Sequence, residues 1–443
     1  MKNFISVFIF LFVISSKAFG QSDAVNDINN IIDDHFESLE VLYKHFHANP
    51  ELSLQEENTS RRLAEELRHL GFSVTEQVGG YGIAGVFENG DGPVILVRSD
   101  MDALPMREET GVPFASSATA VTIDGSETYV MHACGHDMHM TTMVGTAKVL
   151  VQLRDQWSGT LVFIGQPAEE LFLGARAMIG DGLFERFPQP DYMLALHVDS
   201  AMPSGQVGFS SGYAYANVDM GEIVVKGRGG HGAYPNYTVD PVVMASRIVL
   251  DLHTMISREI SATDPANISI GFIRGGSSAN IIPNEVRMEM ALNVHNENTR
   301  ERLIRRIEEK LKAAGIAEGL SEDEWPQLIL NDETRVASVY NDPEMGERVR
   351  HTFQRVLGPE NVYEPLPFMY GEDFGEYNHA MPDIPGILFG VGSIPPDDIK
   401  AAEAGLKEIP TTHSPLYLPD LEPTLRTGIL TMSSAIIDLM NGN

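Results

Sequence analysis

Nine consecutive residues, Met131 to His139, carry side chains of the types that bind metal ions. They include Cys134, the only cysteine of the chain, and three of its fourteen histidines. A thiolate, imidazoles and a carboxylate close together suit a divalent ion such as zinc, which selects sulfur and nitrogen ligands. A buried structural cysteine beside scattered histidines is the ordinary alternative for an isolated residue. Four such side chains within six residues favour the metal site.

Further candidate groups follow three predicted strands. Asp100 and Asp102 come after the apolar run 93–98, the pair Glu169-Glu170 after the run 160–164, and His197 after the run 192–196. Open α/β sheets place their sites at the carboxyl ends of parallel strands. One glutamate of the pair could then bind metal while its neighbour moves protons for a bound water. Taken alone, adjacent glutamates are usually surface charge.

Two further histidines are ambiguous on different grounds. A single histidine such as His197 or His413 is more often a core residue than a ligand. His231 stands in Gly227-Arg-Gly-Gly-His231-Gly-Ala-Tyr-Pro235, where glycines on both sides leave it accessible. This favours a substrate contact. The glycines lack the strand-then-helix context of a dinucleotide or phosphate loop, which excludes that reading.

The spacing of apolar residues predicts the elements that position these groups. Helices and strands alternate along most of the chain, which predicts an α/β domain with a largely parallel sheet. Ser53 and Glu56 form a capping-box pattern at the start of the second helix. The predicted helices are 23–48, 53–70, 141–153, 174–182, 344–357 and 422–440, and the predicted strands are 72–77, 83–88, 93–99, 160–164, 192–196 and 385–390.

Between residues 219 and 331 the pattern changes. Strands at 219–226, 267–274, 284–295 and 327–330 and helices at 240–259 and 298–314 give the order β-α-β-β-α-β, the ferredoxin-like arrangement. We therefore expect a second α+β domain inserted into the first. The predicted division is a signal peptide at 1–20, catalytic parts at 21–217 and 333–443, and the inserted domain at 218–332.

The first twenty residues have the pattern of a secretory signal. Lys2 precedes an apolar stretch, and Ala18 and Gly20 give a small-x-small cleavage pattern before Gln21. We expect a cleaved signal and a secreted or periplasmic enzyme that does not bind a membrane after cleavage; an uncleaved N-terminal anchor is the less favoured alternative. One cysteine cannot form an internal disulfide, and metal ligation would protect its thiol in an oxidising compartment. The net charge of −31 argues against nucleic acid or an anionic membrane as partner.

Seven motifs in this order resemble the aminoacylase/carboxypeptidase metallo-amidohydrolases, the peptidase family M20 type. Within that family the chain is similar to the branch that holds hippurate hydrolases and plant indole-acetyl-amino-acid hydrolases. The resemblance covers nearly the whole mature chain. The motifs are Pro50–Ser53, Arg98–Pro105, Met131–Asp137, Gln166–Glu170, Gly229-Gly230-His231, Asn280–Pro283 and Thr412–Pro415.

The resemblance implies two divalent metal ions, manganese or zinc, in each subunit of a homodimer that pairs through the inserted domain. Cys134 would bridge the ions, with His136 and His197 completing one and Glu170 and His413 the other. Glu169 would be the general base, and Asp102 would orient a metal-bound histidine. His231 of a partner subunit would stabilise the oxyanion, and Asn280 would help to hold the substrate.

The activity expected on this resemblance is hydrolysis of the amide bond of N-acyl amino acids. A dipeptidase or carboxypeptidase with the same site is the near alternative, and a non-catalytic binding protein is the distant one. Two departures from the branch bear on specificity. Leu171-Phe172-Leu173 replaces a glycine-rich run and could reshape the acyl pocket. Asn293 stands where relatives often carry an arginine suited to a substrate carboxylate, and Arg274 and Arg287 are the candidates to replace that arginine.

Overall fold

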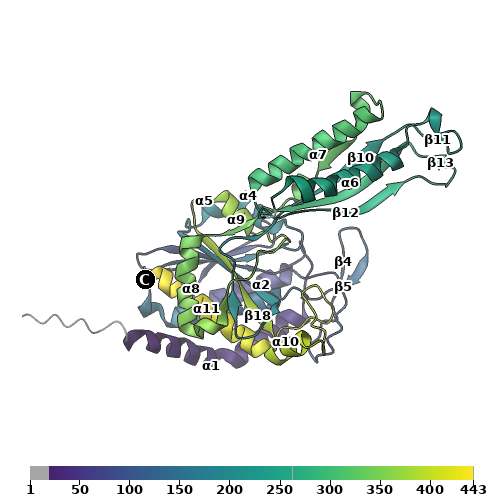
Figure 1. Cartoon of the computed structure of the whole chain (residues 1–443). Coiled ribbons are helices and arrows are strands. Elements are labelled where there is room, and N and C mark those ends of the chain that lie inside the picture. The colour runs from purple at the N-terminus through teal and green to yellow at the C-terminus, as the bar shows by residue number, and fades with distance from the viewer. Residues whose placement is uncertain (1–18, 262, 443) are drawn as a thin grey trace, which may run out of the picture.

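The chain forms two bodies in a computed structural model that describes residues 19–261 and 263–442. Figure 1 shows a compact catalytic body and an elongated second body projecting from it. The predicted signal peptide lies outside the described residues, apart from Phe19 and Gly20. Of the helices that are described, none is both long and apolar enough to cross a lipid bilayer. We use the name inserted domain for residues 218–332.

An eight-stranded sheet is the centre of the catalytic body. Its four middle strands run parallel to one another, and the strand pairs at its edges include antiparallel ones. In order across the sheet the strands are β1 (Ser73–Glu76), β2 (Ile83–Asn89), β6 (Gly159–Gln166), β3 (Val94–Asp100), β7 (Tyr192–Pro203), β18 (Gly386–Ile394), β8 (Val207–Gly208) and β17 (Val362–Tyr363).

Helices cover both faces of this sheet, which explains why its middle strands are continuously apolar. Alternate residues of β3 point to opposite layers: Ile95 and Val97 belong to one hydrophobic core and Leu96 to the other. The first core contains residues of α1 (Phe19–Ala48), α2 (Glu57–His69), α3 (His136–Gln152), α8 (Pro343–Leu357) and α11 (Leu421–Met440); the second contains residues of α4 (Gly174–Gly180), α5 (Leu183–Arg186) and α9 (Gly375–Ala380).

The inserted domain has its own sheet and its own core. Its sheet is antiparallel, with the strand order β12-β14-β10-β15, and α6 and α7 cover one face. This is the ferredoxin-like order that the sequence predicts, so the predicted fold class is confirmed. The elements are β10 (Asn217–Lys226), α6 (Pro241–Glu259), β12 (Ala266–Gly275), β14 (Glu285–Val294), α7 (Glu297–Ala317) and β15 (Gln327–Leu330).

The remaining elements are short, and the spacing of apolar residues does not predict them. They are the hairpin β4 (Thr119–Val121) and β5 (Glu127–Tyr129), the pair β9 (Gly212–Tyr215) and β16 (Val339–Asn341), the pair β11 (Gly230–His231) and β13 (Ile281–Ile282), and the helix α10 (Pro396–Glu403).

Two local predictions are wrong. The capping box does not form, because the Ser53 hydroxyl donates to Asp102 and the Glu56 carboxylate accepts the backbone N–H of Ala168. The helix predicted from Thr141 begins five residues earlier, at His136. In both cases polar side chains form hydrogen bonds with residues that are distant in the sequence, and local spacing does not predict such bonds.

Candidate metal centre

The candidate side chains gather at the carboxyl ends of the middle strands. β3 ends at Asp100 with Asp102 just beyond, β6 is followed by Glu169 and Glu170, and β7 contains His197. The turn before α3, the first turn of that helix and the loop before α11 reach the same edge of the sheet and add Cys134, His136 and His413, respectively.

Cys134 lies at the middle of the five predicted metal ligands. Its Sγ is 3.5 Å from Nε2 of His197 and 3.3 Å from Nε2 of His413. Cys134, His136 and Glu170 offer ligand atoms that all lie within 4.8 Å of one another. Nε2 of His413 is also 3.4 Å from Glu170 Oε2. The fold therefore brings all five together around the thiol.

Backbone carbonyls orient two of the imidazoles. Nδ1 of His136 donates to the backbone oxygen of Asp102 at 2.8 Å, and Nδ1 of His197 donates to that of Val198 at 2.7 Å. In the neutral imidazole each Nε2 is then the nitrogen without a proton, free to bind a metal, and it faces the cluster. His413 is held differently, since its own backbone N–H donates to Ala133 O and its φ of 66° is left-handed. The left-handed conformation is energetically unfavourable for a non-glycine residue, and residues strained in this way are common at functional sites.

Asp102 contacts two of the elements that carry ligands. Its Oδ2 accepts the Ser53 hydroxyl at 2.6 Å and the backbone N–H of Glu170 at 3.0 Å. Its Oδ1 is 3.4 Å from Nδ1 of His136. Burial alone would raise the pKa of Asp102, but the interaction with His136 outweighs it and lowers that pKa. The carboxylate of Asp102 therefore lies beside the imidazole that, by the resemblance, it is expected to orient.

The charge balance of the cluster favours bound cations. Burial raises the pKa of Glu170 to about 7 and, with the neighbouring carboxylates, raises that of the Cys134 thiol well above its usual range. Among the described residues, His136 Nε2 and Glu170 Oε1 are buried without a hydrogen-bond partner. Buried acceptors of this kind need a partner, and a divalent ion is one. The sulfur, nitrogen and oxygen donors fit zinc or manganese.

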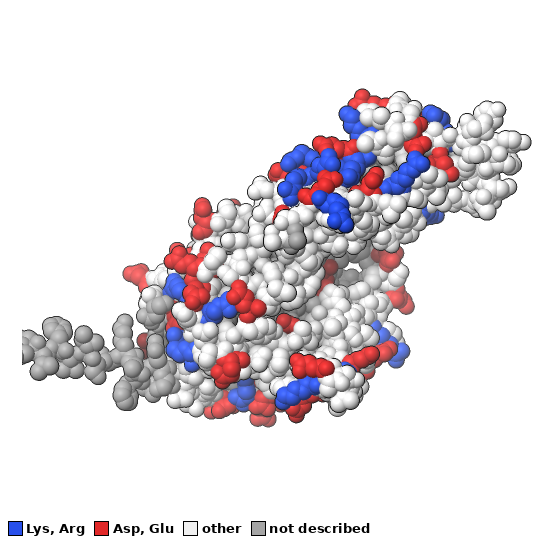
Figure 2. All heavy atoms as spheres, viewed as in Figure 1, with Lys and Arg blue, Asp and Glu red and all other residues white. Residues whose placement is uncertain are grey.

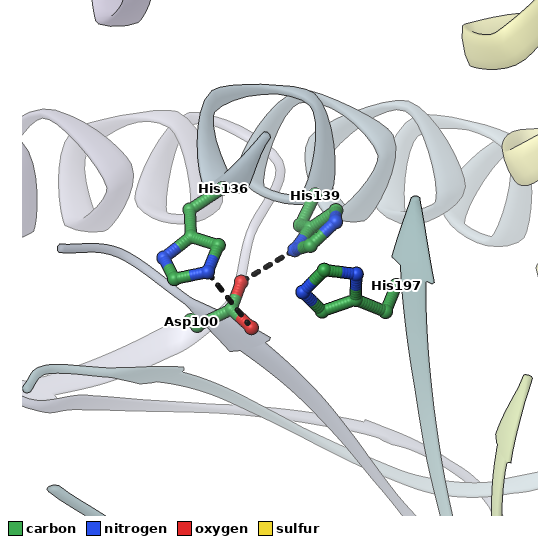
Figure 3. Close-up of side chains that lie close together, drawn as sticks. All are labelled: Asp100, His136, His139 and His197. Carbon is green, nitrogen blue, oxygen red and sulfur yellow. Dashed lines mark hydrogen bonds and ion pairs between the residues drawn. The ribbon is translucent and has the colours of Figure 1, made fainter. Parts of the chain in front are cut away.

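A second group of metal-type side chains has a different use. Asp100, His136, His139 and His197 converge from β3, α3 and β7 (Figure 3). However, Nδ1 of His139 donates to Asp100 at 2.6 Å, and its Nε2 accepts the backbone N–H of Val198 at 2.9 Å. Both nitrogens of His139 are occupied. It therefore braces Asp100 and the His197 strand, a role that sequence reasoning missed.

A buried ionic network lies beneath the cluster and was also missed. Arg98, fully buried, pairs with Asp100 at 2.7 Å and with Glu372 and Asp373 at 2.8 Å each. Glu372, Asp373 and Glu169 lie close enough to share one ion. Burial and these acids raise the pKa of Glu169 well above its usual range. A charged Arg98 in an otherwise apolar strand was the available signal.

A cavity of about 410 Å³ opens beside the cluster. Glu169 and Glu170 line it, and so does Phe172, in the left-handed region at a φ of 57°. Leu171 instead lines a second cavity of about 660 Å³, which also borders Glu170. Leu171 and Phe172, two of the three residues of the run Leu171-Phe172-Leu173, thus line two different cavities that both border Glu170.

His231 and Asn280 lie away from the cluster. His231 is in β11, which pairs with β13 next to Asn280 at the tip of the projecting inserted domain (Figure 1). Both are exposed. Within one chain the structure does not bring them to the ligands or to Glu169.

Comparisons with known proteins agree with this geometry. A model of the peptidase family M20/M25/M40 matches residues 96–406. The chain is 35% identical to the N-acetylcysteine deacetylase of Bacillus subtilis, over 78% of this chain and 86% of that protein. It is 33% identical to the hippurate hydrolase of Campylobacter jejuni, over 76% and 84%.

A solved structure is similar over almost the full length. It is the YXEP protein of Bacillus subtilis, described as a dinuclear metal-binding peptidase of the M20 family. The TM-score is 0.74 at 25% identity, and the match covers 92% of this chain and 99% of that one. The dinuclear description concerns that relative, and it fits a cluster with the donor set found around Cys134.

Proposed function

This chain belongs to the peptidase family M20/M25/M40 and is a hydrolase of amide bonds, and on that premise we propose that it cleaves N-acyl amino acids with two divalent metal ions. The observation that carries the proposal is the convergence of Cys134, His136, Glu170, His197 and His413 beside a cavity that Glu169 also lines. A non-catalytic protein would have no need to keep Glu169 at that place.

In the proposed arrangement Cys134 would help to hold both ions, because its thiol is close to the other four ligands. His136 and His197 would complete one site, and Glu170 and His413 would complete the other. When bound, such ions lower the pKa of a water and polarise a carbonyl oxygen. Manganese and zinc both suit the donors.

Glu169 is the proposed general base. Glu169 is 94% buried and its carboxylate lies among Glu372 and Asp373, which raises its pKa and so favours the protonated form that results when it accepts a proton from water. The same proton can then pass to the departing amine, which leaves neutral. Arg98, paired with both neighbouring acids, opposes this rise in the pKa of Glu169.

His231 is proposed to act from a second subunit. It is exposed at the tip of the inserted domain, together with Asn280. A homodimer that pairs through the inserted domains would carry this tip over the partner's cavity. There His231 would donate to the developing oxyanion and Asn280 would contact the substrate.

Export is a further part of the proposal. The sequence pattern of residues 1–20 and the single cysteine, placed as a metal ligand, support a secreted or periplasmic enzyme. Fractionation of cells producing the full chain, with N-terminal sequencing of the mature form, tests this directly.

Amine release from a panel of N-acyl amino acids and dipeptides tests the function. The mature protein is loaded with manganese or zinc and compared with the variant Glu169→Gln. We expect N-acyl amino acids to be cleaved faster than dipeptides, and the variant to lose about 10²- to 10⁴-fold in kcat with its metal content unchanged.

Glu57→Gln is the matched control, because Glu57 is an exposed partner of Arg61 on α2. It should behave as the wild type. Faster cleavage of dipeptides would move the function to a peptidase with the same site. Bound metal without turnover of any substrate would refute the enzymatic proposal.

A further inference from the structure

One carboxylate in the cavity has no part in the proposed chemistry. Four acidic residues line the cavity of about 410 Å³: Glu169, Glu170, Glu372 and Asp199. The first two belong to the proposed centre, and Glu372 is paired with Arg98 at 2.8 Å. Asp199 accepts the backbone N–H of Ala201 at 2.7 Å, but in the described chain no lysine or arginine pairs with it.

Asp199 lies on the same face of its strand as the proposed metal ligand His197. It stands two residues after His197 in β7, and alternate residues of a strand point to the same face. The buried Val198 between them points the other way. The rise along a strand places the two side chains about 7 Å apart. A group held by Asp199 would therefore belong to the same small molecule as an amide at the metal cluster.

An aromatic wall adjoins this carboxylate. The rings of Tyr215, Phe368 and Tyr370 contact one another, with centroids 5.2, 5.4 and 5.0 Å apart. Tyr215 is buried, whereas Tyr370 is 56% exposed at the mouth of the cavity. Asp199 is close enough to act on a phenol of this wall: burial and then the charge of Asp199 raise the pKa of Tyr370 well above its usual range.

The residues that line the cavity also determine which charge on a substrate the cavity can bind. None of the described residues that line this cavity is a lysine or an arginine. A substrate carboxylate would find no cationic side chain there. A cation would find an ion-pair partner in Asp199 and the negative faces of aromatic rings, the combination that binds organic ammonium groups.

We propose that Asp199 and the aromatic wall of Tyr215, Phe368 and Tyr370 bind a positively charged group, ammonium or guanidinium, on the part of the substrate remote from the scissile amide. This inference rests on the proposed amide hydrolysis at the neighbouring centre. It narrows the substrate class to short amides with a cationic acyl group or a basic amino acid.

Binding to a catalytically impaired protein tests the proposal without turnover. Calorimetry compares Glu169→Gln with the double variant Glu169→Gln/Asp199→Asn, both metal-loaded. The ligands are two isosteric pairs: 4-aminomethylbenzoyl-alanine with 4-ethylbenzoyl-alanine, and N-acetyl-ornithine with N-acetyl-norleucine. We expect the cationic member of one pair to bind about tenfold tighter, and Asp199→Asn to remove that preference while leaving the neutral ligand unchanged.

Two further variants keep the test decisive if Asp199→Asn alters folding. Tyr370→Leu removes a mostly exposed ring and should reduce the same preference. Asp397→Asn, which changes an exposed carboxylate of α10, should leave it intact. The inference is overturned if the neutral ligand of each pair binds tighter than the cationic one. It is also overturned if a preference for the cationic ligand persists in the Asp199→Asn variant. Equal turnover of neutral and cationic substrates by the wild type would also overturn the inference, while the proposed amide hydrolysis would stand. The absence of any turnover would refute the proposed hydrolysis, whereas the binding measurements would still decide the cation site.

Discussion

Asp102 is the residue at which both halves of the proposed centre meet. It accepts the backbone N–H of Glu170 and lies beside the protonated nitrogen of His136. It makes no contact with the cavity, so it acts through the ligands that it orients. The affinity of the proposed centre for metal should therefore depend on Asp102, although Asp102 is not a proposed ligand.

Asp102→Asn should weaken metal binding. The amide keeps the size of the side chain but loses the charge that complements His136, so we expect a 10- to 100-fold loss of metal affinity and of kcat/KM. Metal titration followed by calorimetry measures the affinity directly. Ser53→Ala, which removes only the hydroxyl donor to Asp102, should have a smaller effect. Equal affinity in Asp102→Asn and wild type would contradict the assigned role.

At the scale of elements, His47 joins the end of α1 to the beginning of α3. Its Nδ1 is 2.7 Å from Asp137 and its Nε2 is 3.0 Å from Glu108, and all three side chains are buried. Asp137 directly follows the ligand His136. Burial opposes a charge on His47, but the hydrogen bonds to Asp137 and Glu108 prevail and raise its pKa to about 9.

This pairing predicts a dependence of stability on alkaline pH. The folded-state pKa of His47 exceeds its unfolded value of about 6.5, so its contribution is complete below about pH 6.5 and is lost as pH rises through about 9. The shift corresponds to roughly 3 kcal/mol. Denaturant unfolding from pH 6 to 10 should show this loss in the wild type.

His47→Gln should be less stable at pH 7 and should lack that alkaline loss. His351→Gln is the matched control, since His351 is a surface residue of α8 paired with Glu347. It should follow the wild type at every pH. The same alkaline slope in His47→Gln and wild type would show that His47 is not charged in the folded protein.

At the scale of the whole molecule, the proposed catalytic groups are divided between two bodies. The metal cluster lies in the catalytic body, and His231 lies at the tip of the inserted domain (Figure 1). On the face shown in Figure 2, lysines and arginines gather over the helices of the inserted domain, while the tip is mostly uncharged. The exposed Tyr234, Tyr237 and Ile281 lie at this tip. An uncharged, partly apolar tip suits contact with another subunit.

Mixed dimers test this division. Glu169→Gln and His231→Ala should each be nearly inactive. Co-expressed with two different tags and purified through both, they form a dimer in which one site receives Glu169 from one chain and His231 from the other. We expect about half of the wild-type activity per dimer. A dimer of two Glu169→Gln chains is the inactive control. If the mixed dimer stays inactive, or if no dimer forms, His231 does not act in trans.

The sequence by itself determined the features that depend on local order. Continuous apolar runs predicted the middle strands, and the change of pattern after residue 219 predicted the ferredoxin-like domain. The density of ligand-type side chains at Cys134 predicted the cluster, and the resemblance supplied its remaining members. These succeed because strand burial and motif spacing are properties of neighbouring residues.

Only the tertiary structure decided which distant partner each polar group meets. Ser53 and Glu56 match a capping box locally, yet both serve partners across the fold. His139 belongs to the ligand-rich run, yet it braces Asp100. Asp199 gains significance only from the aromatic wall that other segments build beside it. Hydrogen bonds and ion pairs in a buried site form between whichever groups folding brings within reach, and sequence separation does not constrain that choice.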